Sequence, residues 1–455
     1  MPNAPTRAYL AGPRPGSALA QACADSQRLR TALGDRYLSR PVFLEAAQAQ
    51  EAGRRLSELY DLLLSLPGRL YDGDIRAFAR AVGWSERQIN TALSPDGTAR
   101  PVPRFARSDL YMEESGFRIL ELNVGSPLGG FDTPLIDDVL LADPYVAAFA
   151  QDHGLDTTDT TWVLVKMLQE TLPALGLGTG TAVDDGPVIG LVDWPGSFPY
   201  LRLRLTAMAE LLRPYGIDAI PCHVGQVESR PDGLWVNGRR LDAVHRFYCI
   251  DDVVTAEDAA LLQPIHDAAA EGRTLLFTAL EPEVYGSKGC FAVLSDERNR
   301  AAFTAAELET IDRFLPWTRI LREEKVHVDG ALVDLIPYTK EHREELVIKA
   351  TGSHGGLDVL LGWETDRAQW ERTLDSCAGR PYIVQRRVRP VAEAFPVGDD
   401  TESTQPMVLN WGVFLAGYGY GGAFIRGTTD LQGGVISQAN GAAMGTCFHG
   451  SLERS

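Results

Sequence analysis

Apolar residues recur at helical spacing between residues 41 and 94. Leu56, Leu59 and Leu63 fall on one face of a 3.6-residue period, and a second amphipathic stretch follows. These spacings predict helices whose main role is packing. We therefore expect residues 1–100 to form a mainly helical N-terminal region.

Short apolar runs alternate with helix-length segments over residues 186–286. The predicted strands are Val188–Asp193, Gly216–Val224, Ala243–Ile250 and Arg273–Leu280. Strands separated by helices favour a parallel sheet, and hence a Rossmann-like domain. Because no GxGxxG motif follows the first run, a dinucleotide is not the expected ligand. We interpret this segment as a substrate domain.

A mixed α+β pattern occupies residues 287–449. It predicts a helix at Ala305–Phe314 and strands at Glu345–Lys349, Tyr382–Val388 and Met407–Leu415. The acidic stretch Pro396–Gln405 is typical of an exposed loop. Residues 101–185 are expected to form the first part of one core together with residues 287–449, and residues 450–455 are expected to be a tail of cloning origin. The expected class is α/β, mixed with α+β.

Composition narrows the functional classes. The 455 residues are 45% hydrophobic and 23% charged, as in globular proteins, and are too many for one hydrophobic core. A net charge of -18 repels phosphate backbones and anionic lipid, so we expect neither nucleic acid nor membrane as a partner. The six cysteines form no CxxC or Cys/His cluster, which argues against zinc and a disulfide framework. We expect a cytoplasmic protein.

The segment Ala106–Val124 contains two alternating runs around Glu114-Ser115-Gly116, which predicts a β-hairpin. Closing that loop pairs residues whose numbers sum to 230. Asp109 then faces Glu121, and Arg107 faces Asn123, all on one face of the hairpin. We expect the other face, with Leu110, Met112, Leu120, Leu122 and Val124, to be buried.

Two carboxylates placed directly opposite each other repel and destabilise a hairpin. Asp109 and Glu121 are explained if a divalent cation lies between them, with the amide oxygen of Asn123 as a third ligand. Such hard oxygen ligands suit Mg²⁺, which takes its remaining oxygens from water and phosphate. The alternative is a solvated hairpin face on which Arg107 screens the acids.

Two lysines and an arginine are candidate anion-binding residues. Lys349 ends a short apolar strand and precedes a loop rich in glycine, whose N–H groups could approach phosphate. Lys288 lies in another glycine-flanked loop, and Arg426 follows a glycine-rich hairpin, where its fork could hold a carboxylate or the anionic intermediate of acyl transfer. In isolation each is better explained without a function: Lys349 by an ordinary hairpin turn, Lys288 by a solvated side chain, and Arg426 by a surface ion pair.

Together, in this order, these segments resemble the circularly permuted branch of the ATP-grasp ligases, especially eukaryotic-type glutathione synthetase and glutathionylspermidine synthase. Those enzymes carry Arg-x-Asp followed by Glu-x-Asn, as do Arg107-Ser108-Asp109 and Glu121-Leu122-Asn123. The resemblance covers roughly residues 100–448. It implies an ATP-grasp core and Mg²⁺, with two ions expected, bound by Asp109, Glu121 and Asn123.

The same resemblance implies roles for other residues. Arg107 and Arg426 are expected to be catalytic, Arg107 beside the transferring phosphoryl group and Arg426 gripping substrate. The expected ATP-binding residues are Lys288, Lys349, Gly352, Ser353, Gly355, Gly356, Gln385, Arg386 and Val388. Gln385 stands where the family more usually has glutamate. The expected substrate-binding residues are Ser126, Arg246, Gly433 and Gly434.

The implied function is an ATP-dependent carboxylate–amine ligase that forms an acyl phosphate and releases ADP. The glycine segment after Lys349 is expected to close over the phosphates as a lid. The expected partners are a small-molecule carboxylate and amine, and a second copy of the chain. Two alternatives remain open: transfer of the acyl group to a carrier-protein thiol, and a non-catalytic nucleotide-binding regulator.

Overall fold

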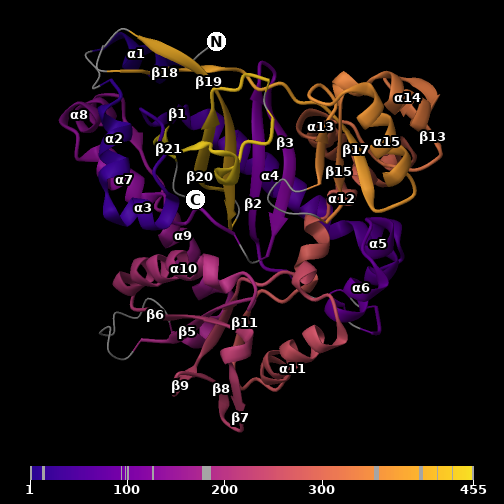
Figure 1. Ribbon diagram of the computed structural model, residues 1–455, viewed down its shortest axis with the longest axis horizontal. Helices are drawn as coiled ribbons and strands as arrows, with labels where there is room; N and C mark the ends of the chain where they lie inside the picture. The colour runs from indigo at the N-terminus through magenta and orange to yellow at the C-terminus, as the bar shows by residue number, and fades with distance from the viewer. Residues whose placement is uncertain are drawn as a thin grey trace.

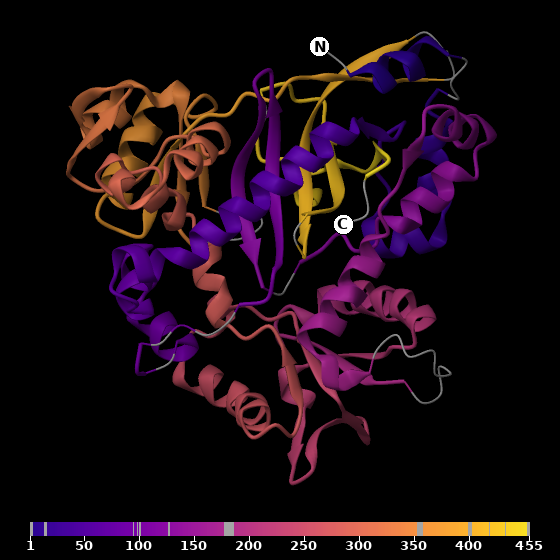
Figure 2. The same ribbon diagram turned by 180° about the vertical axis from the view of Figure 1, so that it is seen from behind.

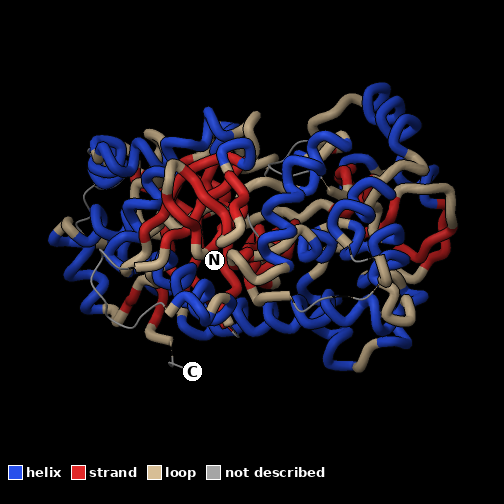
Figure 3. The backbone as a smooth tube through the Cα atoms, turned by 90° about the horizontal axis from the view of Figure 1, so that it is seen from below, coloured by secondary structure: helices blue, strands red, loops and turns tan. Residues whose placement is uncertain are grey.

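The computed structural model describes residues 3–12, 16–93, 95–97, 99, 102–125, 128–176, 186–352, 358–398, 403–417, 419–432 and 434–452. Three larger sheets, each with its own helices, and two small antiparallel sheets make up the described part of the chain (Figure 1). Seen from below, helices surround the strands of the central sheet (Figure 3). No helix in these ranges is long and apolar enough to cross a membrane.

The central sheet has eight strands in the described ranges. Its main path is β1-β21-β20-β19-β2-β3, with β18 paired to β19 and β4 paired to β21. The strands are β1 Val42–Leu44, β2 Phe105–Glu113, β3 Gly116–Val124, β4 Leu155–Asp156, β18 Glu393–Pro396, β19 Thr404–Ala416, β20 Gly419–Thr428 and β21 Ala443–Gly450. All pairs are antiparallel except β1 with β21. This order places the hairpin β2–β3 next to β19 and two strands from Arg426.

The N-terminal region is helical, as predicted, except for β1. Its helices are α1 Ala4–Ala11, α2 Ala18–Asp25, α3 Gln27–Leu33, α4 Ala46–Leu70, α5 Ile75–Ala81 and α6 Glu86–Ala92. The long helix α4 runs across the back of the central sheet (Figure 2). It approaches β20 so closely that a Cβ at Gly53 would lie 2.4 Å from the backbone nitrogen of Tyr420. Glycine is therefore required at that point of α4.

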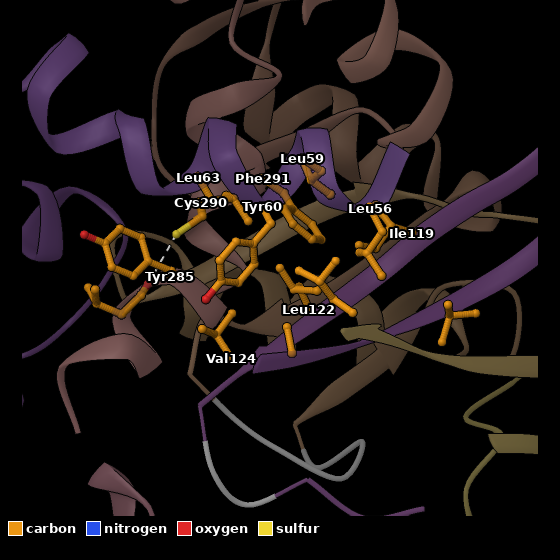
Figure 4. Close-up of a cluster of buried hydrophobic side chains, with 14 of the residues drawn as sticks. Leu56, Leu59, Tyr60, Leu63, Ile119, Leu122, Val124, Tyr285, Cys290 and Phe291 are labelled. Carbon is orange, nitrogen blue, oxygen red and sulfur yellow. Dashed lines mark hydrogen bonds between the residues drawn. The ribbon is translucent and has the colours of Figure 1, made fainter. Parts of the chain in front are cut away.

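The leucine stripe of α4 forms the core beneath the hairpin. Leu56, Leu59 and Leu63 pack toward Ile119 and Leu122 of β3 (Figure 4). Each buried leucine contributes about 1.5–3 kcal/mol to folding. The same cluster contains residues from all four expected domains, so the domain boundaries stay a prediction.

The substrate-side sheet has the order β11-β10-β5-β6 and is parallel throughout, as predicted. Its strands are β5 Val188–Asp193, β6 Asp218–His223, β10 Ala243–Arg246 and β11 Leu275–Phe277, with helices α10 Phe198–Leu212 and α11 Ala256–Ala270. A small antiparallel sheet that the sequence did not predict lies between β6 and β10 along the chain. It is made of β7 Glu228–Arg230, β8 Gly233–Val236 and β9 Arg239–Leu241. Along the chain, three helices separate β3 from β5, the first strand of this sheet: α7 Pro134–Leu141, α8 Pro144–Asp152 and α9 Thr160–Thr171.

The third sheet is antiparallel, with the order β12-β17-β15-β16. Its strands are β12 Thr318–Ile320, β15 Leu346–Ala350, β16 Val359–Leu361 and β17 Tyr382–Arg386. Around it lie the hairpin β13 Lys325–Val328 and β14 Ala331–Asp334, and the helices α12 Gly289–Leu294, α13 Ala305–Phe314, α14 Leu335–Glu341 and α15 Arg367–Cys377. The helix at α13 and the strands at β15, β17 and β19 are confirmed.

The loop expected at Pro396–Gln405 is partly wrong. Pro396 ends β18, Thr404 begins β19, and the two residues pair across the strands. The acidic residues that suggested a loop lie between these strand ends, in a segment that includes residues outside the described ranges.

Candidate active site

A cavity of about 340 Å³ opens between the central sheet and the third sheet. The charged and polar side chains in its wall come mainly from the hairpin β2–β3 and from the neighbouring β19 and β20. The third sheet contributes Lys349 and Gln385, together with the apolar residues Val347, Val359 and Leu361. The cavity therefore joins an apolar wall to a charged one.

The hairpin has the predicted pairing but a different turn. Arg107 lies opposite Asn123, and Asp109 opposite Glu121. The turn is shorter than expected, because Glu113 pairs directly with Gly116. A register shift between Asp109 and Leu110 then restores the predicted pairs.

This irregularity changes which side chains reach the cavity. Leu110 pairs with Ile119, which is buried, whereas Leu120 has no directly opposite partner in the register. Leu120 was expected on the buried face, and this is wrong: it is half-buried and lines the cavity. A bulge inserts one residue and re-aims the side chains around it.

Cations from distant parts of the chain lie beside both hairpin carboxylates. Arg426 Nη2 of β20 is 2.7 Å from Asp109 Oδ1, and Lys288 Nζ is 3.2 Å from Glu121 Oε2. Arg426 Nη2 also donates to Asn410 Oδ1 at 3.0 Å. Asp109, Lys288 and Arg426 are all buried, so solvent screens the attraction between these opposite charges only weakly.

Arg107 completes this charged wall. Its Nη1 donates to the carbonyl of Gly129 at 2.7 Å, and its Nε lies 3.5 Å from Asp109 Oδ1. Burial lowers the pKa of Arg107, while neighbouring Asp109 partly opposes that shift. Because a guanidinium remains charged at neutral pH even so, Arg107 provides a fixed cation next to Asp109.

Lys349 is the second buried lysine beside the hairpin. Its Nζ donates to Gln385 Oε1 at 2.8 Å and to the Leu120 carbonyl at 3.4 Å. Burial lowers the pKa of Lys349 to about 8, although Glu121 raises it. Gln385 itself donates to Thr318 Oγ1 at 3.1 Å, which fixes its oxygen toward the lysine. Gln385, which stands where the family that the sequence resembles more usually has glutamate, therefore positions Lys349.

The remaining predicted nucleotide residues fall into three groups. Val388 lines the cavity, and so does Arg386, although the Arg386 guanidinium pairs with Asp329 at 2.8 Å. Gly352 lies beside Lys288, whose backbone N–H donates to the Thr351 carbonyl at 2.9 Å. The expected lid residues Ser353, Gly355 and Gly356 lie outside the described residues.

The predicted substrate residues divide in the same way. Gly434 lines the cavity, and its carbonyl accepts from the Tyr111 hydroxyl at 2.7 Å. Ser126 and Gly433 lie outside the described residues.

The assignment of Arg246 to substrate binding is wrong for this structure. Arg246 is 0% exposed, and it forms an ion pair with Glu283. Its other bonds go to three backbone carbonyls, those of Thr278, Tyr248 and Ala279. Because each guanidinium nitrogen has a protein acceptor, Arg246 holds the end of β10 to the following loops rather than binding a ligand.

Several cavity residues were not predicted from the sequence, among them the polar side chains of Tyr111, Arg204, Glu283 and Asn410. Tyr111 and Asn410 lie in strands that were predicted, at positions on the same face as Asp109 and beside Arg426. Strand periodicity could have found Tyr111, which is two residues after Asp109. Nothing local marks Arg204 of α10, because its role depends on how two lobes meet.

The hairpin donors fit a magnesium ion chemically. Asp109 and Glu121 supply two opposed carboxylates, and Asn123 supplies an amide on the same face. Asn123 Nδ2 donates to the Arg107 carbonyl at 3.3 Å, which leaves its amide oxygen available. This set of oxygen ligands matches the preference of Mg²⁺.

Neither a protein-family model nor a curated protein matches this sequence. Among solved structures, a glutathione synthetase-like effector from Globodera pallida, in its apo form, is 14% identical, with 95% of each chain covered and a TM-score of 0.56. A candidate γ-glutamylcysteine synthetase from Methylobacillus flagellatus is 13% identical over 89% of each chain, with a TM-score of 0.44. The ATP-grasp ligase PsnB, complexed with a minimal precursor, is 12% identical over 53% of this chain and 85% of its own, with a TM-score of 0.28.

Only the first likeness is high enough to bear on the fold. It extends over nearly the whole chain, so it includes the central sheet, the parallel sheet and the third sheet together. The circular permutation stays a prediction. This chain therefore has an ATP-grasp fold of the glutathione synthetase-like kind.

Proposed function

We propose that this chain is an ATP- and Mg²⁺-dependent carboxylate–amine ligase that acts through an acyl phosphate. The observation that carries the proposal is the arrangement of charges around one cavity. Arg107, Lys349 and Arg426 surround the carboxylates of Asp109 and Glu121, with Lys288 behind Glu121. Such a density of cations over a pair of opposed acids suits a metal–polyphosphate complex.

The two walls of the cavity suggest how the nucleotide lies. Val347, Val359, Leu361 and Val388 provide an apolar surface for the adenine ring. The N–H groups of Arg386 and Arg387 already donate to the carbonyls of Trp317 and Glu345. Backbone contacts to adenine are therefore expected after Arg387, at Val388.

Lys349 links the adenine side to the reacting side. Its position between Gln385 and the hairpin lets its ammonium bind phosphate oxygens, and Lys288 approaches from the far side of Glu121. Asp109, Glu121 and Asn123 would hold Mg²⁺, which supplies charge neutralisation at the phosphates when bound. Arg426 and Lys288 would then exchange their carboxylate contacts for contacts with anionic ligands.

The chemical steps follow from this arrangement. A carboxylate oxygen of the substrate forms a bond to the γ-phosphorus, and the bond from that phosphorus to the bridging oxygen breaks, which leaves ADP. Arg107 lies beside Asp109, where it can stabilise the charge on the transferring phosphoryl group. An amine nitrogen then bonds to the acyl carbon, phosphate leaves with the electron pair, and the amine loses a proton. Arg426 orients the carboxylate through both steps.

Oxygen-18 transfer tests this proposal. A carboxylate substrate labelled in both oxygens should deliver one label to the released phosphate and keep the other in the amide. Substrates can be found first by screening carboxylate–amine pairs for phosphate release. Label recovered in AMP would instead show adenylation and contradict the proposal.

A further inference from the structure

A second cavity of about 150 Å³ lies against the first, and nothing in the proposed catalytic machinery uses it. Leu128, Gly129 and Arg204 line both cavities. The wall of this side pocket is otherwise mostly apolar, with contributions from Phe131, Leu164, Leu201, Leu205, Met208 and Phe247. The partition between the cavities is thin, because the Gly129 carbonyl that lies in it also accepts from Arg107.

One buried carboxylate interrupts this apolar wall. Asp132 is 8% exposed, and its Oδ1 has no hydrogen-bond partner within the described ranges. Its Oδ2 is 3.7 Å from Arg204 Nη2, which is too far for a hydrogen bond. Burial raises the pKa of Asp132, and Arg204 opposes that shift. A buried acceptor without a donor costs folding free energy, so a ligand that brings a donor would be stabilised here.

Arg204 differs from Asp132 in where it can reach. Its side chain is about one-third exposed and lines both cavities, whereas Asp132 lines only the side pocket. A ligand that spans the two residues would therefore present its anionic group toward the catalytic cavity and its cationic group away from it.

We propose that the side pocket binds an apolar α-amino acid as the acyl donor of the ligase. Its side chain fills the apolar pocket, its ammonium donates to Asp132, and its carboxylate lies at Arg204, facing the phosphates. The role of the amino acid as acyl donor rests on the proposed function, but its binding to the side pocket does not require catalysis. It names the substrate class that the proposed function leaves open.

The composition of the pocket sets this class apart from others. A single carboxylate and a single guanidinium match the two charges of a free amino acid. A second acidic group on the ligand would be placed among leucine and phenylalanine side chains, with no cation other than Arg204 among the described lining residues, and burying it would be costly. The volume suits one aliphatic or aromatic side chain and not a peptide.

Direct binding to the full-length protein without nucleotide provides the test. Isothermal titration with leucine, methionine and phenylalanine should give affinities at least about tenfold higher than with glycine or glutamate, because only the apolar side chains are transferred from water. Equal affinities for leucine and glycine, or no binding of any of the five, would overturn the proposal.

Variants separate the two recognition elements. Asp132→Asn should weaken leucine binding by about tenfold or more, because it removes the charged acceptor of the ammonium, but should leave 4-methylpentanoate, which lacks that group, within about twofold. Asp137→Asn is the matched control, since Asp137 is also a buried carboxylate but lies outside the pocket. Met208→Trp should reduce leucine binding by filling the pocket. An equal effect of the two asparagine variants on leucine would overturn the assignment of Asp132.

The outcomes distinguish this inference from the proposed function. Binding of leucine without ADP formation, with any amine, would uphold the pocket and contradict the ligase. ADP formation only with donors that lack an apolar side chain would uphold the ligase and overturn the pocket.

Discussion

Asp109 and Glu121 lie directly opposite each other on β2 and β3, and a cation from a different part of the chain lies beside each of them. Opposed like charges destabilise a hairpin. Here Arg426 and Lys288 offset that repulsion when no other cation is present. The same two side chains are available to anionic ligands once a metal ion takes over the carboxylates.

Glu121→Gln should abolish metal-dependent turnover without unfolding the protein. Glutamine keeps the size of the side chain and can still accept from Lys288, but it removes one charged metal ligand. We expect turnover to fall by at least about 100-fold. Glu114→Gln, in the exposed hairpin turn, is the control and should leave turnover unchanged. Steady-state phosphate release and thermal unfolding would measure both effects, and near-normal turnover of Glu121→Gln would contradict the metal assignment.

Arg426→Lys should separate catalysis from nucleotide binding. One terminal nitrogen of Arg426 contacts both Asp109 and Asn410, and lysine keeps the charge but not the planar fork. We expect kcat to fall by about 100-fold while the Kd for Mg·ATP changes by less than about threefold. Arg389→Lys, in an exposed pair with Glu345, serves as the control. A weakened Kd with normal kcat would assign Arg426 to the nucleotide instead.

ATP affinity should depend on pH through Lys349. Its pKa of about 8 means that the free protein loses this cation as the pH rises through 8. The Kd for ATP should then be constant below about pH 7 and rise by up to about tenfold per pH unit above 8. Lys349→Arg should remove that dependence. Titrations at pH 6.5 to 9.5 would measure it, and an unchanged slope in Lys349→Arg would exclude Lys349 as its source.

The lowered pKa of Lys349 should also make the free energy of unfolding depend on pH, in the opposite direction to the affinity for ATP. The unfolded chain binds the Lys349 proton more tightly than the folded chain between pH 8 and the ordinary pKa of 10.5. The contribution of Lys349 to the free energy of unfolding should therefore increase across that window as the pH rises.

Arg246→Met should destabilise the fold and not change recognition of a substrate directly. The substitution leaves Glu283 buried without its ion-pair partner, at a cost of about 3–5 kcal/mol in the free energy of unfolding. Arg239→Met, an exposed residue of β9, is the control. Urea unfolding would measure the difference. A normal unfolding curve combined with a raised KM for one substrate would restore the role that the sequence pattern indicated.

The sequence predicted which charged residues of the hairpin face each other, but not the turn that joins its strands. Alternation alone indicated that Asp109 and Glu121 share a face, and the register agrees. The turn and the bulge each shift the pairing by one residue in opposite directions, so the predicted pairs emerge although the intervening pairs differ. Leu120 was therefore assigned to the wrong face, because nothing in the local sequence indicates the bulge.

The remaining errors arise where distant segments meet. The strand β1 pairs in parallel with β21, some 400 residues later, and no local pattern indicates this. Arg246 resembled a ligand residue because it ends a strand of the substrate domain, but burial against Glu283 decides its role. The strands of β7–β9 are only three or four residues long, too short for periodicity to detect.

The nucleotide product tests the central claim most directly. The full-length protein is incubated with ATP, Mg²⁺ and a carboxylate–amine pair that supports turnover, and the nucleotides and the amide are quantified by chromatography in the same sample. We expect one ADP and one phosphate for each amide formed, and no product when Mg²⁺ is chelated. AMP and pyrophosphate in that ratio, or amide formation that continues without Mg²⁺, would contradict it.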